Sequence, residues 1–408
     1  VANRAHHADI GGIAPGSMPS DATCLEEEGI VFPPEKFLDR GRERRAVLDR
    51  FRRRTRNPKE RLGDLRAQVA ANELGARRVR ELVERTGATR HRADAAEILD
   101  YSERRVRAVI ARLPRGTWEA EDFLEAPGDV RPSRIRIAAK VTIGGSGLTV
   151  DFEGTDRQVR GNLNAPFPVT LSSAYYVLRC LTDPEAPPNA GAYRPLRVLA
   201  SEGTVVRARS PAAVAAGNVE TSQRIVDVLF RALAVPLADR VPAQSQGTMN
   251  NVTIGSDRRP GFSYYETIAG GEGALPYRAG MDGVHTHMTN TRNTPVEALE
   301  LAYPLRVEEY RLMPGSGGGG RFRGGDGIRR AVRLLASSAV VSVISDRRAI
   351  PPKGERGGEA GRRGRNRLVR GGRSVVLPAK VTLRLRRGDL LVIETPGGGG
   401  WGTPPVPG

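Results

Sequence analysis

Hydrophobic positions in the first third of the chain recur with the period of an amphipathic helix. Residues 64–86 are predicted to form one helix, because Asp64 is a good N-cap, apolar residues return every three to four positions, and Gly87 favours a stop. A second apolar stripe covers residues 99–113, and a proline directly after it is expected to end that helix. We therefore expect residues 1–125 to be mainly helical.

Past about residue 130 the pattern changes to the strict alternation that strands show. Two further helices are predicted at residues 169–181 and 221–233, and the second is apolar nearly all round, so we expect it to be buried. The final third is expected to consist of short strands separated by glycine turns, at residues 263–268, 305–312, 328–334, 339–344, 381–385 and 390–393.

These patterns together predict a mixed α+β fold. At 408 residues the chain is long enough to bury a large core and to be an enzyme. We expect residues 1–402 to form one domain, in which the mainly helical part (1–125) is followed by a mixed to β-rich part with several short sheets (130–402).

The composition argues against a membrane protein and against a disulfide-stabilised one. No apolar run approaches the roughly 18 residues that a membrane helix needs. The two cysteines, Cys24 and Cys180, lie far apart in the sequence, so they predict no disulfide framework and fit a reducing compartment. We therefore expect a cytoplasmic protein with no membrane partner.

The formal net charge of +18 raises nucleic acid as a partner. Only five of the 64 basic residues are lysines, however, and the arginines concentrate at residues 40–56 and 356–373, where Phe51 is the one aromatic residue that could stack on a base. Nucleic-acid binding is therefore disfavoured. We expect these arginine-rich stretches to be solvated loops or part of a contact with another subunit.

The densest polar cluster lies at residues 3–12, where His6, His7 and Asp9 precede a Gly-Gly turn. Imidazole together with carboxylate suits Zn²⁺, Mn²⁺ or iron better than Ca²⁺, which prefers oxygen ligands alone. The alternative is a solvated turn, since adjacent histidines often have no ligand at all.

A second polar stretch covers residues 283–294 and includes His285 and His287. In an extended segment a His-x-His pair places both imidazoles on one face, where they can act together. Glu266 lies upstream in a glycine-rich stretch, and Asn290 and Arg292 follow the histidines. Side chains this polar are poor core material, so they either cover the surface or line a cleft.

Two more stretches are candidate cleft walls. One contains Asn164, and the other contains Asn218 and Arg224 directly around the start of the predicted buried helix. Thr221 or Ser222 is expected to cap that helix, which leaves a purely structural role open for Asn218 and Arg224.

Glycine runs at residues 315–320 and 397–400 do not match a nucleotide site. Neither is followed by Lys-Ser or Lys-Thr, and neither stands between a strand and a helix. We expect tight turns or closely approaching backbone there, and no ATP bound by this chain. A nucleophilic side chain is also the less favoured mechanism, because the chain lacks a Gly-x-Ser-x-Gly elbow and neither cysteine has a neighbouring histidine.

Eight stretches, in order and with plausible spacing, closely resemble the hydantoinase B family and, within it, the C-terminal half of 5-oxoprolinase. They are His6-His7-Ala8-Asp9-Ile10-Gly11-Gly12 continuing to Pro15-Gly16-Ser17-Met18-Pro19, residues 64–72, Gly161-Asn162-Leu163-Asn164-Ala165-Pro166, Thr221-Ser222-Gln223-Arg224, Met249-Asn250-Asn251, Tyr264-Tyr265-Glu266-Thr267, residues 287–292, and Pro396-Gly397-Gly398-Gly399-Gly400-Trp401-Gly402. The resemblance runs from end to end.

This resemblance implies ATP-dependent opening of a cyclic amide, such as 5-oxo-L-proline or a hydantoin. In such enzymes a separate A-type subunit or domain binds ATP and activates the ring, and the B-type part handles the activated intermediate. Related carboxylases of simple ketones share the B-type architecture. A divalent metal ion, Mn²⁺ or Zn²⁺, is implied in the B-type part, where it would activate water for hydrolysis.

Carried over to this chain, the resemblance implies His6, His7 and Asp9 as metal ligands. It implies catalytic or positioning roles for His285, His287, Glu266 and Arg292, and substrate contacts from Asn164, Asn218, Arg224 and Asn290.

One departure from the family pattern stands out. The family carries, before the first histidine motif, an Asn-Asp-Pro-Tyr stretch and a Gly-Gly-x-His-x-x-Asp stretch, whereas this sequence starts at Val1. We therefore expect an N-terminally truncated chain whose metal site lacks part of its ligands. The alternative function is a catalytically silent assembly subunit that holds an acidic partner through its arginine-rich loops.

Overall fold

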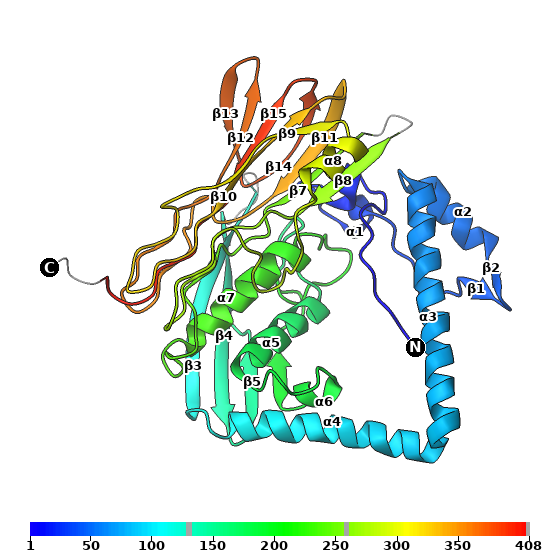
Figure 1. The fold of residues 1–408 in the computed structure, drawn as a ribbon, viewed down its shortest axis with the longest axis vertical. Coiled ribbons are helices and arrows are strands. Elements are labelled where there is room, and N and C mark those ends of the chain that lie inside the picture. The colour runs from blue at the N-terminus through cyan, green and yellow to red at the C-terminus, as the bar shows by residue number, and fades with distance from the viewer. Residues whose placement is uncertain (128–132, 257–260, 405–408) are drawn as a thin grey trace.

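The computed structural model describes residues 1–127, 133–256 and 261–404 and has a mixed α+β fold. Figure 1 shows a two-helix arm, a four-stranded sheet covered by helices, and a pair of packed sheets at the other end of the molecule. Long extended segments connect these parts. The predicted fold class, mixed α+β with several short sheets, is confirmed.

The first 110 residues form helices and one short hairpin, joined before residue 45 by long irregular segments. The elements are η1 (Pro15–Ser17), α1 (Leu25–Glu28), β1 (Leu38–Asp39), β2 (Arg42–Glu43), α2 (Arg45–Arg54), α3 (Pro58–Thr86) and α4 (Ala88–Ile110). Helix α3 begins at Pro58, six residues before the predicted cap, because proline is tolerated in a first turn and Gly63 does not interrupt an exposed helix. Gly87, at φ +81°, ends it as predicted.

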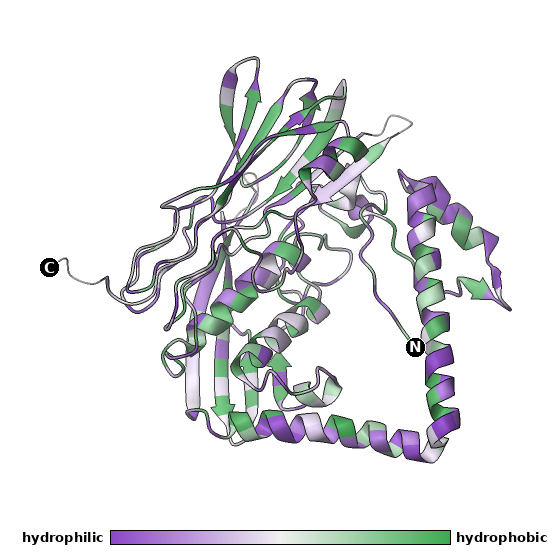
Figure 2. Ribbon diagram, viewed as in Figure 1, coloured by the Kyte–Doolittle hydropathy of each residue, from purple (hydrophilic) through white to green (hydrophobic). Residues whose placement is uncertain are grey.

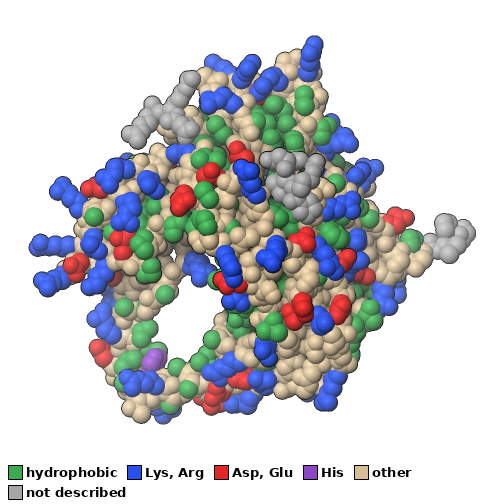
Figure 3. All heavy atoms as spheres, turned by 180° about the vertical axis from the view of Figure 1, so that it is seen from behind, with side chains coloured by type: hydrophobic (Ala, Val, Ile, Leu, Met, Phe, Trp, Pro, Cys, Tyr) green, Lys and Arg blue, Asp and Glu red, His purple; other side chains and the backbone are tan. Residues whose placement is uncertain are grey.

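Helices α3 and α4 form an arm that stands away from the rest of the protein. Along α3 only Leu62 is buried, and α4 buries residues only towards its C-terminal end. Leu74, Val79, Ile98 and Tyr101 are 43–52% exposed. Figure 3 shows, from behind, an opening enclosed by this arm and the body. The arm is therefore a surface whose apolar side chains are left uncovered by the described residues.

The first large sheet has the order β3-β4-β5-β6. Its strands are β3 (Gly116–Glu125), β4 (Arg134–Gly144), β5 (Gly147–Asp151) and β6 (Leu196–Leu199), and only β6 is parallel to its neighbour. Strand β3 begins inside the stretch expected to be helical, because its alternating acidic residues face β4 across the outer surface. The expected change of period at residue 130 lies outside the described residues.

Helices α5 (Phe167–Leu181) and α7 (Ser222–Leu233) pack against this sheet, and α6 (Ala190–Tyr193) packs against α4. Both long helices were predicted. Every residue of α7 is buried except Arg231, as its apolar pattern predicted. The expected hydroxyl cap is wrong: a π-turn, η2 (Gly217–Thr221), runs into α7, and the Thr221 hydroxyl bonds to the carbonyl of Leu163.

Two antiparallel sheets share a second core. One has the order β14-β11-β7-β8 and the other β13-β12-β15-β10-β9. Their elements are β7 (Asn251–Ser256), β8 (Phe262–Glu266), α8 (Val296–Ala302), β9 (Leu305–Leu312), β10 (Ile328–Leu334), β11 (Ser338–Ile344), β12 (Arg365–Arg370), β13 (Arg373–Leu377), β14 (Lys380–Arg386) and β15 (Leu390–Glu394).

All six strands predicted for the final third are present. Strand β12 lies in the arginine-rich stretch expected to be a solvated loop or a subunit contact, because arginine and glycine mask the alternation of its buried Asn366 and Leu368. In Figure 2 the strands of this pair of sheets carry long green apolar stretches, whereas the arm is mixed purple and green.

Glycine-rich segments run side by side without forming regular strands (Figure 1). Backbone N–H groups bond from one segment to the next, for example Gly398 to Gly325 and Gly325 to Glu272, both within 2.9 Å. A Cβ on Gly398 would lie 2.0 Å from the carbonyl oxygen of Glu272, so only glycine permits this spacing. The expectation of closely approaching backbone at residues 397–400 is confirmed.

None of the helices in the described part of the chain is long and apolar enough to cross a membrane.

Candidate functional site

A pocket of about 300 Å³ lies between α5, α7 and the loop before α8. We name it the histidine pocket; its lining consists of Tyr176, Cys180, Leu181, Phe230, Arg240, Pro242, Ser245, Glu272, Leu275, Tyr277, Met281, His285, Thr286 and His287. Apolar and aromatic walls with a few polar groups are typical of a small-molecule site.

Both histidines of the His-x-His stretch line this pocket, but not from a strand. His287 has φ +59°, a left-handed conformation that is costly for a non-glycine residue and is often found at functional sites. Its Nδ1 hydrogen-bonds with the Tyr176 hydroxyl at 3.2 Å, and its ring packs against Phe230. Desolvation lowers the pKa of His287 to about 4, so the imidazole is neutral at pH 7.

His285 has unused hydrogen-bonding capacity. Neither of its ring nitrogens has a partner within the described residues, and neither does the neighbouring Thr286 hydroxyl. The side-chain amide of Gln223 donates to the Thr286 carbonyl at 3.0 Å and fixes the backbone there. Burial lowers the pKa of His285, so this neutral ring presents one N–H donor and one acceptor at the pocket wall.

Glu272 is the carboxylate among the described lining residues, and it is already paired with an arginine. Glu272 forms two charge-assisted bonds with Arg278, at 2.8 and 3.0 Å, and accepts the N–H of Met281 at 2.9 Å. Cys180 is the other residue able to react; it is exposed, but desolvation by the neighbouring protein atoms raises the pKa of its thiol. Cys180 is therefore mostly protonated at neutral pH, which fits the expectation that a nucleophilic side chain is not the mechanism.

Two of the four predicted catalytic residues lie elsewhere. Glu266 is buried in an ion pair with Arg330, with 2.8 Å between carboxylate and guanidinium, and it accepts the N–H of Thr294. Arg292 and Asn290 are exposed and are not part of the pocket lining. The structure thus brings His285 and His287 together but separates them from Glu266, Arg292 and Asn290.

The N-terminal motif forms a loop that is held together by hydrogen bonds to Asp9. Asp9 is buried, and its two carboxylate oxygens accept the N–H groups of Gly11 and Gly16 at 2.9 and 2.7 Å. Arg56 adds an ion pair at 3.3 Å. This arrangement explains why the motif is rich in glycine: a Cβ on Gly11 would lie 2.5 Å from a backbone oxygen.

The two neighbouring histidines are held separately from that carboxylate. His7 accepts a hydrogen bond at Nε2 from the Gln68 amide at 2.9 Å, and His6 stacks on Tyr265 with ring centroids 5.6 Å apart. Within the described residues no group of three or more His, Cys, Asp or Glu side chains could hold a metal ion. As placed here, His6, His7 and Asp9 do not fit a metal ion by themselves.

Arg224 belongs to a buried charge network at the junction of the two cores. Its guanidinium bonds to Asp122, Asp227 and Asp346 at 2.9–3.2 Å, and it is fully buried. Arg347 bonds to two of the same carboxylates. Arg224 does not line the histidine pocket. Its placement therefore favours a structural role, which the sequence had left open, and not the predicted substrate contact.

Asn164 and Asn218 also lie outside the histidine pocket. Asn164 is buried, and its side chain bonds to backbone groups of Val159, Gly161 and Ala213 at 2.8–3.1 Å. Asn218 is exposed. The placement of Asn164 favours a structural role.

Glu28, the last residue of the short acidic helix α1, also has a structural role. Glu28 accepts the N–H groups of Val214 and Ala215, both at 2.8 Å, and burial raises its pKa to about 7.

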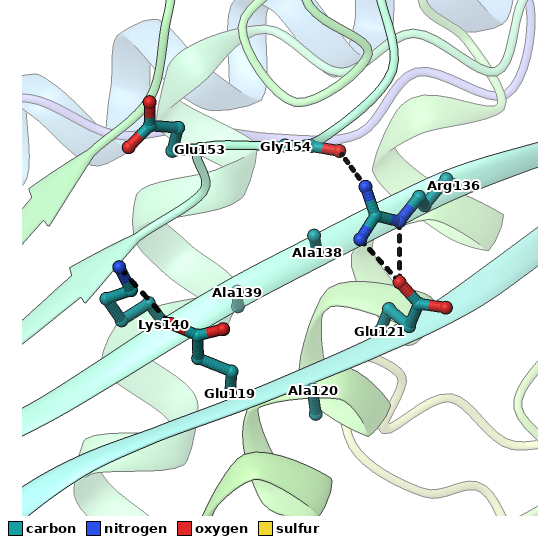
Figure 4. A pocket seen from close by; sticks show the side chains of 9 residues that line it. All are labelled: Glu119, Ala120, Glu121, Arg136, Ala138, Ala139, Lys140, Glu153 and Gly154. Carbon is teal, nitrogen blue, oxygen red and sulfur yellow. Dashed lines mark hydrogen bonds and ion pairs between the residues drawn. The ribbon is translucent and has the colours of Figure 1, made fainter.

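A second hollow, of about 400 Å³, lies on the outer face of β3 and β4, beside the turn that follows β5 (Figure 4). Small alanine side chains form its floor, and charged side chains surround it and point toward one another. Arg136 bonds to Glu121 at 2.6 Å, and Lys140 pairs with Glu119 at 3.2 Å. Because these charges satisfy one another at an exposed surface, we assign no ligand to this hollow.

Sequence reasoning missed Tyr176, Cys180, Ser245 and Phe230. Tyr176 and Cys180 are four residues apart on α5, which places them on one helix face, but that spacing is common in any buried helix. Glu272 lies in the same glycine-rich stretch as Glu266, and its position in the sequence predicted no role for it in the pocket.

Comparisons with known proteins now add to this geometry. The family profile of hydantoinase B/oxoprolinase matches residues 1–404. 5-Oxoprolinase 1 of Arabidopsis thaliana is 37% identical over 99% of this chain, which spans 33% of that protein. A protein of Pseudomonas sp. (strain NS671), whose name makes it the B component of a D-/L-hydantoinase, is 35% identical, and 98% of this chain covers 70% of it.

The fold is similar to a solved structure. The crystal structure of the ATP-dependent caprolactamase from Pseudomonas jessenii superposes with a TM-score of 0.88 at 27% identity, covering 98% of this chain and 72% of that one. The chain therefore belongs to the hydantoinase B/oxoprolinase family.

Proposed function

We propose that this chain is the B-type component of an ATP-dependent enzyme that opens a cyclic amide, with a separate A-type component binding ATP and activating the ring. The observation that carries the proposal is the match to the family over nearly the whole chain, including a relative named as the B component of a hydantoinase. The histidine pocket supports it, because it offers neutral imidazoles in a site of small-molecule size.

Within this proposal the pocket binds the ring. One ring nitrogen of His285 and the hydroxyl of Thr286 offer the donor and the acceptor that match the C=O and N–H of an amide, and Tyr176 fixes the orientation of His287. A neutral imidazole is also able to accept a proton from attacking water. The ring opens in this scheme through water rather than through a protein nucleophile.

A divalent metal ion, Mn²⁺ or Zn²⁺, remains a prediction from the family resemblance. His6, His7 and Asp9 do not fit it by themselves, because both Asp9 oxygens are used by backbone N–H groups. No step of the proposal runs through a metal. Elemental analysis of the purified chain checks the prediction: stoichiometric metal that is lost on His6→Ala supports it, and no bound metal contradicts it.

The test of the function uses the complex of this chain with an A-type subunit from the same organism. ADP release is measured with 2-pyrrolidinone, hydantoin and 5-oxoproline as substrates. We expect at least one cyclic amide to stimulate ATP turnover and His287→Gln to reduce ring opening. His91→Gln, a matched change on the arm, leaves the rates unchanged. Failure of every cyclic amide to stimulate turnover refutes the proposal.

The exposed arm favours a second candidate function, a catalytically silent assembly subunit. Leu74, Val79, Ile98 and Tyr101 are suited to contact another protein, as large exposed apolar side chains do at interfaces. If this is the whole role, Val79→Glu disrupts the complex with the A-type subunit in size-exclusion chromatography, and His287→Gln in the intact complex has no effect on ring opening.

A further inference from the structure

The electrostatics of the histidine pocket restrict the kind of ring that it accepts. The proposed function leaves several substrates open, among them 5-oxoproline, which carries a carboxylate, and lactams or hydantoins, which are neutral. These differ by one full negative charge. The charges that line the pocket therefore bear directly on the choice.

Few groups in the lining are able to hold a carboxylate. His285 and His287 are neutral at pH 7, since burial lowers the pKa of both rings. Arg240 is the one cation among the described lining residues; it is exposed at the mouth, with Asp239 3.6 Å away. Arg278 bonds to Glu272 through two nitrogens and is not a lining residue.

Glu272 is the carboxylate among the described lining residues, and its charge is compensated by Arg278 and by the N–H of Met281. Arg278 is therefore already paired and is not free to hold a ligand. A ligand carboxylate would lose its hydration in the pocket without gaining a buried cation, which disfavours it.

A neutral cyclic amide, in contrast, finds hydrogen-bonding groups in the pocket that have no partner among the described residues. The ring nitrogens of His285 and the hydroxyl of Thr286 are buried and have no partner among the described residues. Unpaired buried polar atoms are costly, so a ligand that supplies both a donor and an acceptor gains from pairing with them. The N–H and C=O of a cyclic amide lie side by side, so one of them pairs with a ring nitrogen of His285 and the other with the Thr286 hydroxyl. Leu181, Phe230 and Leu275 supply apolar walls for the carbon part of the ring.

We propose that the histidine pocket selects neutral cyclic amides over cyclic amides that carry a carboxylate. The proposal rests on the proposed function only in taking a ring amide as the ligand. It predicts that 2-pyrrolidinone binds about tenfold or more tightly than 5-oxoproline, which differs from it only by the carboxylate.

Cys180 provides a direct measure of occupancy, because it lines the pocket and is exposed. The experiment follows alkylation of Cys180 by iodoacetamide in a Cys24→Ser background, at alkaline pH to ionise the thiol. Increasing 2-pyrrolidinone is expected to slow the labelling saturably, and 5-oxoproline at the same concentrations is not. Equal protection by the two compounds, stronger protection by 5-oxoproline, or no protection by either overturns the proposal.

Variants then test the contacts. Thr286→Val, which keeps the shape of the side chain, weakens protection by 2-pyrrolidinone about fivefold, and His285→Ala weakens it further. His91→Ala is the matched control and leaves protection unchanged. Unchanged protection in both His285→Ala and Thr286→Val places the ligand elsewhere and overturns the proposal. The assay needs neither ATP nor a partner, so its failure is distinct from failure of the ATP-turnover test.

Discussion

Replacement of Arg224 by methionine tests whether this residue holds the fold or a substrate. Its guanidinium is fully buried between Asp122, Asp227 and Asp346. Removing one partner of a buried ion pair costs about 3–5 kcal/mol, because a charge is left without compensation. Arg347 still pairs with two of the carboxylates in the variant, and Lys380 lies 3.5 Å from Asp346. We therefore expect a loss within this range and not beyond it.

The assay is urea unfolding followed by circular dichroism, with Arg231→Met as the control. Arg231 is on the same helix but is not buried, so the same substitution there is expected to cost less than about 1 kcal/mol. A second change, Asp346→Asn in the Arg224→Met background, is expected to recover part of the loss, since it removes a charge left without its guanidinium. An unfolding free energy for Arg224→Met within about 1 kcal/mol of the wild type refutes the structural assignment.

Three further predictions concern the glycine segments, a buried acid and the N-terminal loop. Gly398→Ala is expected to lower the unfolding free energy by about 3 kcal/mol or more, because the new Cβ would lie 2.0 Å from a carbonyl oxygen. The control Gly63→Ala, on exposed α3, is expected to raise the unfolding free energy by up to about 1 kcal/mol, and equal melting temperatures of the two variants contradict this. Burial raises the pKa of Glu220 from 4.5 to about 7, so the carboxyl of the unfolded chain ionises first and the unfolding free energy falls as the pH rises from about 4.5 to 7. Glu220→Gln keeps the two hydrogen bonds that the side chain accepts and is expected to reduce this loss of unfolding free energy; an unchanged dependence on pH contradicts the assignment. Asp9→Ala is expected to lower the unfolding free energy by about 1–3 kcal/mol in metal-free buffer, and an effect seen only with added metal would show a ligand role instead.

The local pattern of the sequence determined most of the elements. Helix α7 was predictable because its apolar residues cover all sides, and the strands β9, β10 and β11 because their side chains alternate or are continuously apolar. The hairpin β12–β13 was not, since its arginines hide a strand whose buried face is only partly apolar. The glycine segments were predictable as close backbone but not in their order, because their hydrogen bonds join segments that are far apart in the sequence.

The histidine motif at residues 3–12, the His-x-His stretch and the family resemblance came from the sequence alone. Only the tertiary structure decided what each polar residue contacts. It placed Asp9 on backbone N–H groups, Arg224 in a buried network, and His285 and His287 in one pocket with Tyr176 and Cys180. The physical reason is that hydrogen bonding and desolvation depend on neighbours brought from distant segments, whereas periodicity reports only which face of an element is buried.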